Sequence, residues 1–248
     1  MTTCKEISKY LNEELRINDI EDHCCNGLQL ENEKTIAKIG FAVDACKETF
    51  QKTSEKKCQM LIVHHGLIWN ELKHIKGNTY QNIKYLINNN LALYAAHLPL
   101  DMHNKYGNNI QLAKILRLNE IRAFGYHHGK AIGVIGNVNT NLDKIKQILT
   151  TNKMQTLTLN FGPEKIKKIA IVSGGASEDI YQAIAAGADL FLTGEPMHHL
   201  HHVAKENKIN VIFAGHYETE VWGVKALMPL LKEKFKVEVE FLDVPTLI

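Results

Sequence analysis

The chain has 248 residues, of which 45% are hydrophobic and 23% charged, and its formal net charge is +2. These are ordinary values for a globular protein, and the length suffices for one large α/β domain or two smaller lobes. The lysines are scattered rather than gathered into a stripe, so the charge pattern does not indicate nucleic-acid binding. Residues 1–15 carry charges throughout, and no apolar run approaches the roughly 18 residues that span a bilayer. We therefore expect a cytoplasmic protein without a secretory signal or membrane segment.

Apolar runs alternate with amphipathic segments along the whole chain. In chain order we expect a helix (5–15), a loop (26–29), a strand (38–43), a helix (47–56), a strand (60–63), a helix (79–89), a strand (91–96), a helix (108–116), a strand (131–138), a helix (142–149), short strands (156–159, 168–172, 190–192 and 211–213) with helices between them, a long helix (218–234) and a final strand (237–242). This alternation predicts an α/β fold with largely parallel sheets.

The chain also contains an internal repeat. Residues 39–65 align without a gap with residues 169–195, strand on strand and helix on helix. After a change in length, residues 93–101 match residues 212–220, and both copies read apolar strand, two small residues, His-x3-carboxylate. Because short apolar strands are common, a chance match remains an alternative. We expect one domain, residues 1–248, made of two related α/β lobes, approximately 1–125 and 126–248, that face a shared cleft.

Histidine is the outlier in the composition, with thirteen residues, many of them in pairs. Functional groups of α/β proteins gather beyond the carboxyl ends of the strands, where a polar side chain can reach a cleft. Four apolar runs are followed there by polar groups, which are His64-His65, His97 with Asp101, Glu195, and His216 with Glu220. Their repeated position makes them the candidates for chemistry.

The spacing of these groups favours a metal site. His216 and Glu220 are four residues apart, which places them on one face of a helix. His64 and His65 would point to opposite faces of a regular strand, but Gly66 permits an irregular turn after them. Mixed imidazole and carboxylate donors suit Zn, Fe, Mn, Co or Ni.

The donors exceed the needs of one tetrahedral ion, so we expect two divalent ions per chain, about 3.5–4 Å apart. The predicted metal ligands are His64, His65, Asp101, His216 and Glu220. Histidine pairs are more often found on surfaces, and His-x3-Glu is frequent by chance, so each motif alone is weak.

Other polar groups leave alternatives open. The adjacent Cys24-Cys25 could form a thiolate site or be ordinary thiols, and the cysteines contain no CxxC pair or disulfide framework. His198-His199 with His201-His202 reads as a polar helical face near the cleft or an interface, and His127-His128 as part of a loop. The turn at residues 173–177 could bind a phosphate through free N–H groups, or be a plain tight turn.

Several segments together resemble a known family. They are Asn26-Gly27-Leu28-Gln29, Ala42-Val43-Asp44, Leu61 to Gly66, Tyr94 to Asp101, Ser173-Gly174-Gly175, Gly187-Ala188-Asp189, Thr193-Gly194-Glu195 and Gly215 to Glu220. Each is weak alone, but the ordered set covers essentially the whole chain. It resembles the GTP cyclohydrolase 1 type 2 family, also called the interacting-factor-three-like family.

The resemblance implies a two-lobed α/β protomer with a dinuclear metal centre, because the five predicted ligands fall on the family's ligand motifs. It also implies a ring-shaped homohexamer whose metal sites face an inner cavity. A member of the family has been assigned the hydrolytic opening of GTP, which releases formate. Gly66 stands where proline is common, and Leu98-Pro99 where Thr-Asn is common, which leaves the identity of the substrate open.

We therefore expect a metal-dependent hydrolase that opens a GTP-like purine nucleotide with a metal-bound hydroxide. Glu195 and His97 are the predicted proton-transfer groups, although His97 could instead orient Asp101 or the substrate. The alternative is a non-catalytic protein for metal trafficking or scaffolding, which needs the same ligands. A role as a partner of transcription factors has no supporting basic or groove-binding feature.

Overall fold

The computed structural model describes residues 2–70 and 74–246. The chain forms two compact α/β units, one made of Met1–Leu100 and Gly223–Val244 and the other of Asp101–Trp222 and Pro245–Ile248. These limits differ from the expected halves 1–125 and 126–248. The reason is the C-terminal strand β11 (Glu238–Phe241), which pairs in parallel with β2 (Lys38–Asp44) and so returns the end of the chain to the first unit.

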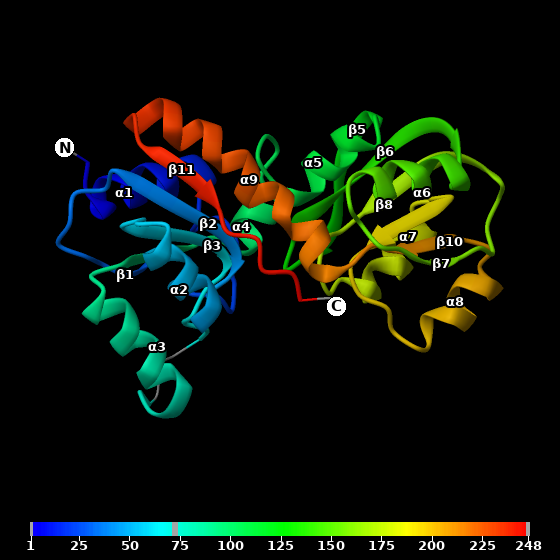
Figure 1. Cartoon of the computed structure of the whole chain (residues 1–248). Coiled ribbons are helices and arrows are strands. Elements are labelled where there is room, and N and C mark those ends of the chain that lie inside the picture. The colour runs from blue at the N-terminus through cyan, green and yellow to red at the C-terminus, as the bar shows by residue number, and fades with distance from the viewer. Residues whose placement is uncertain (1, 71–73, 247–248) are drawn as a thin grey trace. The chain divides into compact units, whose positions relative to one another are not determined.

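The first unit contains a sheet of order β1-β4-β3-β2-β11, of which Figure 1 labels β1, β3, β2 and β11. The remaining strands are β1 (Gly27–Leu30), β3 (Met60–His65) and β4 (Ala92–Ala95). All neighbours pair in parallel except β1 and β4, so the expectation of a largely parallel sheet is confirmed here. The central strands supply fully buried side chains, which explains their apolar sequences.

Helices cover this sheet. They are α1 (Cys4–Leu15), α2 (Lys47–Glu55), α3 (Gly77–Asn88) and the later turns of α9 (His216–Phe235). The start of α1 is fixed by a capping box, in which the Thr3 hydroxyl accepts the N–H of Glu6 and the Glu6 carboxylate accepts the N–H of Thr3. α1 packs against the end of α9, where the rings of Tyr10 and Phe235 meet edge to face with centroids 5.5 Å apart.

The second unit contains a sheet of order β5-β6-β8-β9-β10-β7. The strands are β5 (Asn119–His127), β6 (Lys130–Asn141), β7 (Leu157–Leu159), β8 (Lys165–Ile171), β9 (Leu190–Thr193) and β10 (Asn210–Phe213). Only β8, β9 and β10 are mutually parallel, so this sheet is mixed. One of the three antiparallel pairs, β5 with β6, is a hairpin, in whose tight turn His128 and Gly129 adopt positive φ angles of 47° and 77°.

The helical segments of this unit are short. They are α4 (Leu98–Asp101), whose last residue belongs to it, α5 (Asn108–Ile115), α6 (Leu142–Thr151), the 3₁₀ turn η1 (Ser177–Asp179), α7 (Ile180–Ala185), α8 (Leu200–Glu206) and the first turns of α9. A buried apolar cluster of Leu, Ile, Met and Ala side chains lies between the sheet and helices α5 and α6. It provides the rigid base on which the strand ends of the second unit rest.

The internal repeat is visible in strand register. Ile39 lies opposite Met60 in the β2–β3 pair, and Ile169 lies opposite Leu190 in the β8–β9 pair. The gap-free alignment of residues 39–65 with 169–195 equates these two pairs residue for residue. It also equates α2 with the segment formed by η1 and α7. The first part of the expected repeat is therefore confirmed.

For the second part of the repeat, the predicted alignment of residues 93–101 with residues 212–220 is wrong by one residue. In the first unit Leu61 faces Leu93, but its equivalent Phe191 faces Val211 rather than Ile212. By this register the counterpart of His97 is Gly215, not His216. Gly215 has a φ of 86°, which suits glycine, and helix α9 begins directly after it. The motif His-x3-carboxylate thus occurs twice in the sequence without occupying equivalent positions in the two units.

Two strands were not expected from the sequence. Residues 26–29 were expected to form a loop, but Gly27–Leu30 is strand β1, held by antiparallel pairing with β4. This segment is only four residues long and begins with a glycine, so the strand depends on its tertiary partner. β5 was missed because most of its side chains are exposed and its sequence lacks an apolar run. In the described residues, no helix is both long and apolar enough to cross a membrane.

Candidate metal centre

Three imidazoles gather at the strand ends of the first unit. His64 and His65 are the last two residues of β3, and His97 follows β4. One ring nitrogen of each lies within 4.8 Å of one ring nitrogen of the other two. The ring centroids of His64 and His65 are 4.7 Å apart, although neighbours in a strand usually diverge. A group of three imidazoles at such distances can hold a divalent transition-metal ion.

Each of these rings is oriented through Nδ1. The acceptors are a main-chain carbonyl oxygen or a carboxylate, neither of which carries a proton to donate at neutral pH. Nδ1 therefore bears the hydrogen in each ring, and the lone pair lies on Nε2. Metal-binding histidines are held in this way. The bonds run from His64 to Ala96 O (2.9 Å), from His65 to Asp44 Oδ1 (2.7 Å) and from His97 to Asp22 Oδ1 (2.9 Å).

Asp22 is the most strongly perturbed of these acceptors. Burial acts to raise the pKa of its carboxyl, but hydrogen bonds from His97, from the Asn26 amide and from the N–H of Cys24 lower the pKa to about 2. The carboxylate is thus charged throughout the neutral range and fixes the orientation of His97.

The segment that begins β1 supports the three imidazoles. Asn26 accepts the main-chain N–H of His97 at 2.7 Å and donates to Asp22 at 2.8 Å. Gln29 accepts the N–H groups of both residues that follow Gly66 and donates to Ile68 O at 3.1 Å. A Cβ at Gly66 would lie only 2.2 Å from Gln29 Nε2. These two polar side chains therefore bind the loops after β3 and β4 to one edge strand.

Carboxylates dominate the corresponding region of the second unit. Asp101, at the end of α4, is 5% exposed, and its Oδ1 accepts hydrogen bonds from Asn108 Nδ2 (2.8 Å) and Ser173 Oγ (3.0 Å). At the start of α9, His216 Nε2 lies 3.1 Å from Glu220 Oε2. The i, i+4 spacing thus brings an imidazole and a buried carboxylate together, as predicted for one face of a helix.

His216 lies between two carboxylates. Its Nδ1 donates to Glu195, which follows β9, and its Nε2 faces Glu220. Burial acts to lower the pKa of His216, but Glu220 and Glu195 outweigh it and raise the pKa to about 9. Gly174 leaves room for this group, because a Cβ there would lie 2.2 Å from Glu220 Oε1 and 3.2 Å from His216 Nε2. The arrangement attracts a cation, whether a proton or a metal ion.

Comparison with known proteins identifies the family. A family model described as Duf34/NIF3 (NGG1p interacting factor 3) matches residues 2–247. The chain belongs to the NIF3 family. This confirms the resemblance carried by the sequence motifs, since the relatives of this chain bear the name "GTP cyclohydrolase 1 type 2 homolog".

Two NIF3-family relatives illustrate the similarity. A protein of Archaeoglobus fulgidus is 41% identical over 243 residues, covering 97% of this chain and 98% of the relative. A protein of Pyrococcus horikoshii is 43% identical over 245 residues, with 97% and 98% covered. Among solved structures, TTHA1606 from Thermus thermophilus matches with a TM-score of 0.91 and 37% identity over 100% of both chains. The mixed α/β fold with two sheets is therefore that of NIF3-family proteins.

The NIF3-family structure places the seven predicted site residues in two groups. The first unit holds His64, His65 and His97, and the second holds Asp101, Glu195, His216 and Glu220. Both predicted proton-transfer groups contact candidate ligands, since Glu195 bonds to His216 and the ring of His97 lies 5.1 Å from that of His64.

Sequence reasoning missed the residues that orient the candidate ligands and His97. These are Asp22, Asn26, Asp44, Asn108 and Ser173. Asn26, Asp44 and Ser173 lie in segments that carried the family resemblance, which was the signal available for them. Asp22 and Asn108 had no such signal.

Other predicted groups have ordinary roles in the structure. The turn at residues 173–177 does not present a full set of N–H groups to a phosphate, because the N–H groups of Ser173 and Gly174 donate to Asn109 Oδ1 and Thr219 Oγ1. His127 lies at the end of β5 rather than in a loop and pairs with the buried Asp179 at 3.0 Å. His199, just before α8, pairs with Glu178 at 3.1 Å.

Proposed function

We propose that this chain is a metal-dependent hydrolase of the NIF3 family that acts on a GTP-like purine nucleotide. One observation carries the proposal: each imidazole of the candidate centre is held through Nδ1 by a carboxylate or a carbonyl oxygen. Imidazoles that serve only as surface or packing groups have no need of such uniform orientation. The proposed ligands of two divalent ions are His64, His65, Asp101, His216 and Glu220.

The donor set fits transition metals. Imidazole nitrogens and carboxylate oxygens suit Zn, Fe, Mn, Co or Ni, and the described part of the site contains no thiolate that would favour Cu(I) or an iron–sulfur cluster. The carboxylates of Asp44 and Glu195 raise the basicity of the imidazoles they contact, which strengthens binding. When bound, the ions would supply Lewis acidity, lowering the pKa of a water molecule towards about 7 and polarising the electrophilic carbon.

The residues of the chain then have distinct tasks. His97, held by Asp22 with its lone pair on Nε2, is placed to accept a proton. Glu195 holds His216 in one orientation and is the second proposed proton carrier. Asn108 and Ser173 keep Asp101 in one rotamer by donating to its Oδ1.

The substrate class comes from the relatives, which are named "GTP cyclohydrolase 1 type 2 homolog". Opening of a purine ring by water needs an activated nucleophile and a proton carrier, and the proposed residues provide for both. A homohexamer, implied by the same resemblance, remains a prediction that light scattering on the purified protein would test.

Metal content per chain, measured by elemental mass spectrometry on untagged protein purified without chelator, is the first test. We expect about two transition-metal ions per chain. The same preparation, incubated with GTP, should release formate at a rate that falls on chelation and returns when the metal is restored. No bound metal after reconstitution with Zn, Mn or Fe would contradict the proposal. Two exchangeable ions without any turnover would instead indicate the alternative, a metal carrier.

A further inference from the structure

A pocket of about 320 Å³ opens in the second unit beside the end of β10. The antiparallel pairing of β7 with β10 ends at the Leu157–Phe213 pair, and the preceding residues of the chain border the pocket. The volume falls at the lower end of the range for small-molecule sites, so it suits one ring system rather than a whole cofactor. The pocket is distinct from the seven residues proposed for metal binding and proton transfer.

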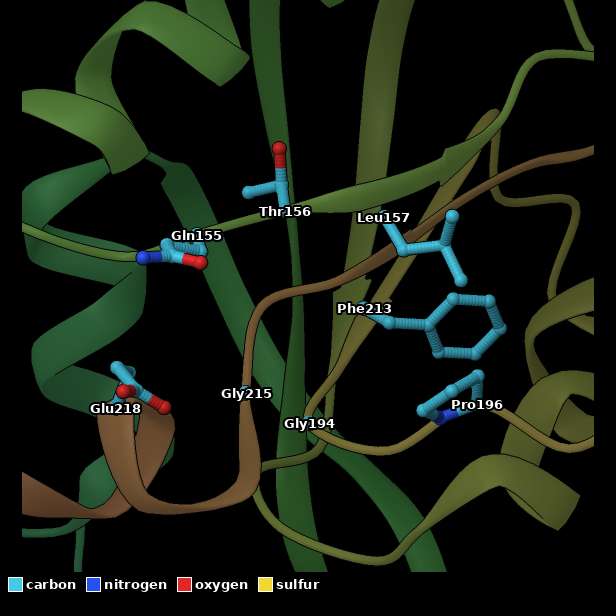
Figure 2. A pocket seen from close by; sticks show the side chains of 8 residues that line it. All are labelled: Gln155, Thr156, Leu157, Gly194, Pro196, Phe213, Gly215 and Glu218. Carbon is cyan, nitrogen blue, oxygen red and sulfur yellow. The ribbon is translucent and has the colours of Figure 1, made fainter. Parts of the chain in front are cut away.

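One wall of the pocket is apolar. Leu157 and Phe213 are cross-strand partners, and Pro196 completes the group (Figure 2). Leu157, the first residue of β7, is 55% exposed. An exposed leucine beside an aromatic ring and a proline offers a flat surface to a planar ligand.

The other side of the pocket is polar. Figure 2 shows Gln155 and Glu218 on the side away from Leu157 and Phe213, with Gly194 and Gly215 between the two sides. Within the described residues, neither the Glu218 carboxylate nor the Gln155 amide takes part in a hydrogen bond or an ion pair. A Cβ at Gly215 would lie 2.0 Å from Glu218 Oε2, so a side chain at Gly215 would displace the carboxylate from this position. The pocket therefore presents acceptors that no neighbouring side chain uses.

We propose that this pocket binds a flat heterocycle with two adjacent N–H donors on one edge. The ring lies against Leu157, Phe213 and Pro196, and the donors face Glu218. A carboxylate accepts two parallel N–H bonds, and such charge-assisted pairs are stronger than neutral ones. A ligand carrying only an ammonium group would satisfy Glu218 but would leave the apolar wall uncovered.

This inference rests on the proposed function, because the ring is taken to be the base of the nucleotide substrate. Two of the residues that line the pocket are chain neighbours of candidate site residues in the second unit. Gly215 precedes His216, Gly194 precedes Glu195, and a Cβ on Gly194 would lie 2.8 Å from His216 Cα. A ring bound in the pocket would therefore be held beside these two side chains.

Three nucleosides test the pocket without any chemistry. Guanosine carries two adjacent N–H donors on one ring edge, inosine carries one, and adenosine has an acceptor in the place of that donor. Binding is measured by calorimetry on metal-stripped protein. We expect affinity to fall in the order guanosine, inosine, adenosine, with at least about a tenfold difference between the first and the last. Equal affinity for all three would overturn the proposal.

Two test variants and one control variant identify the residues that line the pocket and bind the ring. Glu218→Gln, which loses the charge and one acceptor, should abolish the preference for guanosine, whereas Glu206→Gln, an exposed glutamate on α8, should leave it unchanged. Leu157→Ala should weaken the binding of all three nucleosides by the same factor. An unchanged preference in Glu218→Gln would overturn the proposal.

The outcome is separable from that of the proposed function. If the protein binds two ions but shows no nucleoside preference, only the proposed role of the pocket is refuted. A protein that shows the preference but neither binds metal nor turns over GTP would support the pocket and refute the hydrolase.

Discussion

The two units place the same chemical pair on different positions of a shared scaffold. In the first, the carboxylate of Asp44, at the end of β2, holds the imidazole of His65, at the end of β3. The repeat equates these residues with Gly174 and Glu195. In the second unit the carboxylate has therefore moved to the later strand, and it holds His216 at the start of α9.

The difference shows what a repeated fold fixes and what it leaves free. Strand register is reproduced residue for residue in the first two strands of the repeat, because the buried strands must keep their packing. The residues just beyond the strand ends face fewer such constraints, so Glu195 stands where the first unit has the imidazole of His65, and the imidazole of the second unit comes from the start of α9. The first unit presents three imidazoles, whereas the second presents one imidazole among three carboxylates.

Removal of one ligand from each unit is expected to have the largest effect. His65→Ala and Glu220→Ala should each reduce metal content by about one ion per chain and abolish formate release. His202→Ala, an exposed histidine of α8, serves as the matched control and should keep both ions. Elemental mass spectrometry on all three proteins gives the comparison. Unchanged stoichiometry in either ligand variant would refute the assignment of that ligand.

The two supporting carboxylates, Asp44 and Glu195, should contribute equally to metal affinity. Asp44→Asn and Glu195→Gln keep shape but remove charge, and each should weaken metal binding by roughly 10–100-fold. Competition with a chelator of known affinity measures the loss. If Glu195→Gln lowers the turnover rate far more than metal affinity, while Asp44→Asn does not, Glu195 also carries a proton. Equal losses of both quantities in the two variants would restrict Glu195 to positioning.

Replacement of Gly174, the residue equivalent to Asp44 in the repeat, should disturb the second unit alone. In Gly174→Ala a methyl group would enter the space occupied by Glu220 Oε1, and the φ of 67° adds backbone strain of about 1–3 kcal/mol. We expect a lower thermal midpoint and loss of metal. Gly129→Ala is the matched control, because it shares a positive φ but meets no atom within 4 Å. If both variants lose metal, backbone strain rather than the clash is responsible.

Much of this architecture was predictable from the sequence. The buried strands and the amphipathic helices α1, α2 and α6 follow from apolar periodicity, and the i, i+4 spacing correctly paired His216 with Glu220. Strand β1 was missed because it is only four residues long, begins with a glycine and is held by its pairing with β4. The role of Asp22 was also hidden, since its contact with His97 joins loops 75 residues apart. Such long-range polar contacts depend on tertiary structure and leave no local pattern.

The smallest expected effect is that of removing the contact between Asp22 and His97. The second unit lacks this contact, because Gly215 occupies the position of His97. The pKa of Asp22 is lowered to about 2 in the folded chain from an ordinary 3.8. A lowered carboxyl pKa stabilises the fold above the unfolded value, and this stability is lost as the pH falls from about 4 to about 2. In metal-free protein, Asp22→Asn should therefore reduce the free energy of unfolding at pH 7 by about 2 kcal/mol. The deficit should shrink towards pH 2, whereas Asp143→Asn, whose side chain is 89% exposed, should show none. Urea denaturation at pH 7, 4 and 2.5 measures these differences, and a deficit that stays constant with pH would show that Asp22 acts by shape rather than by charge.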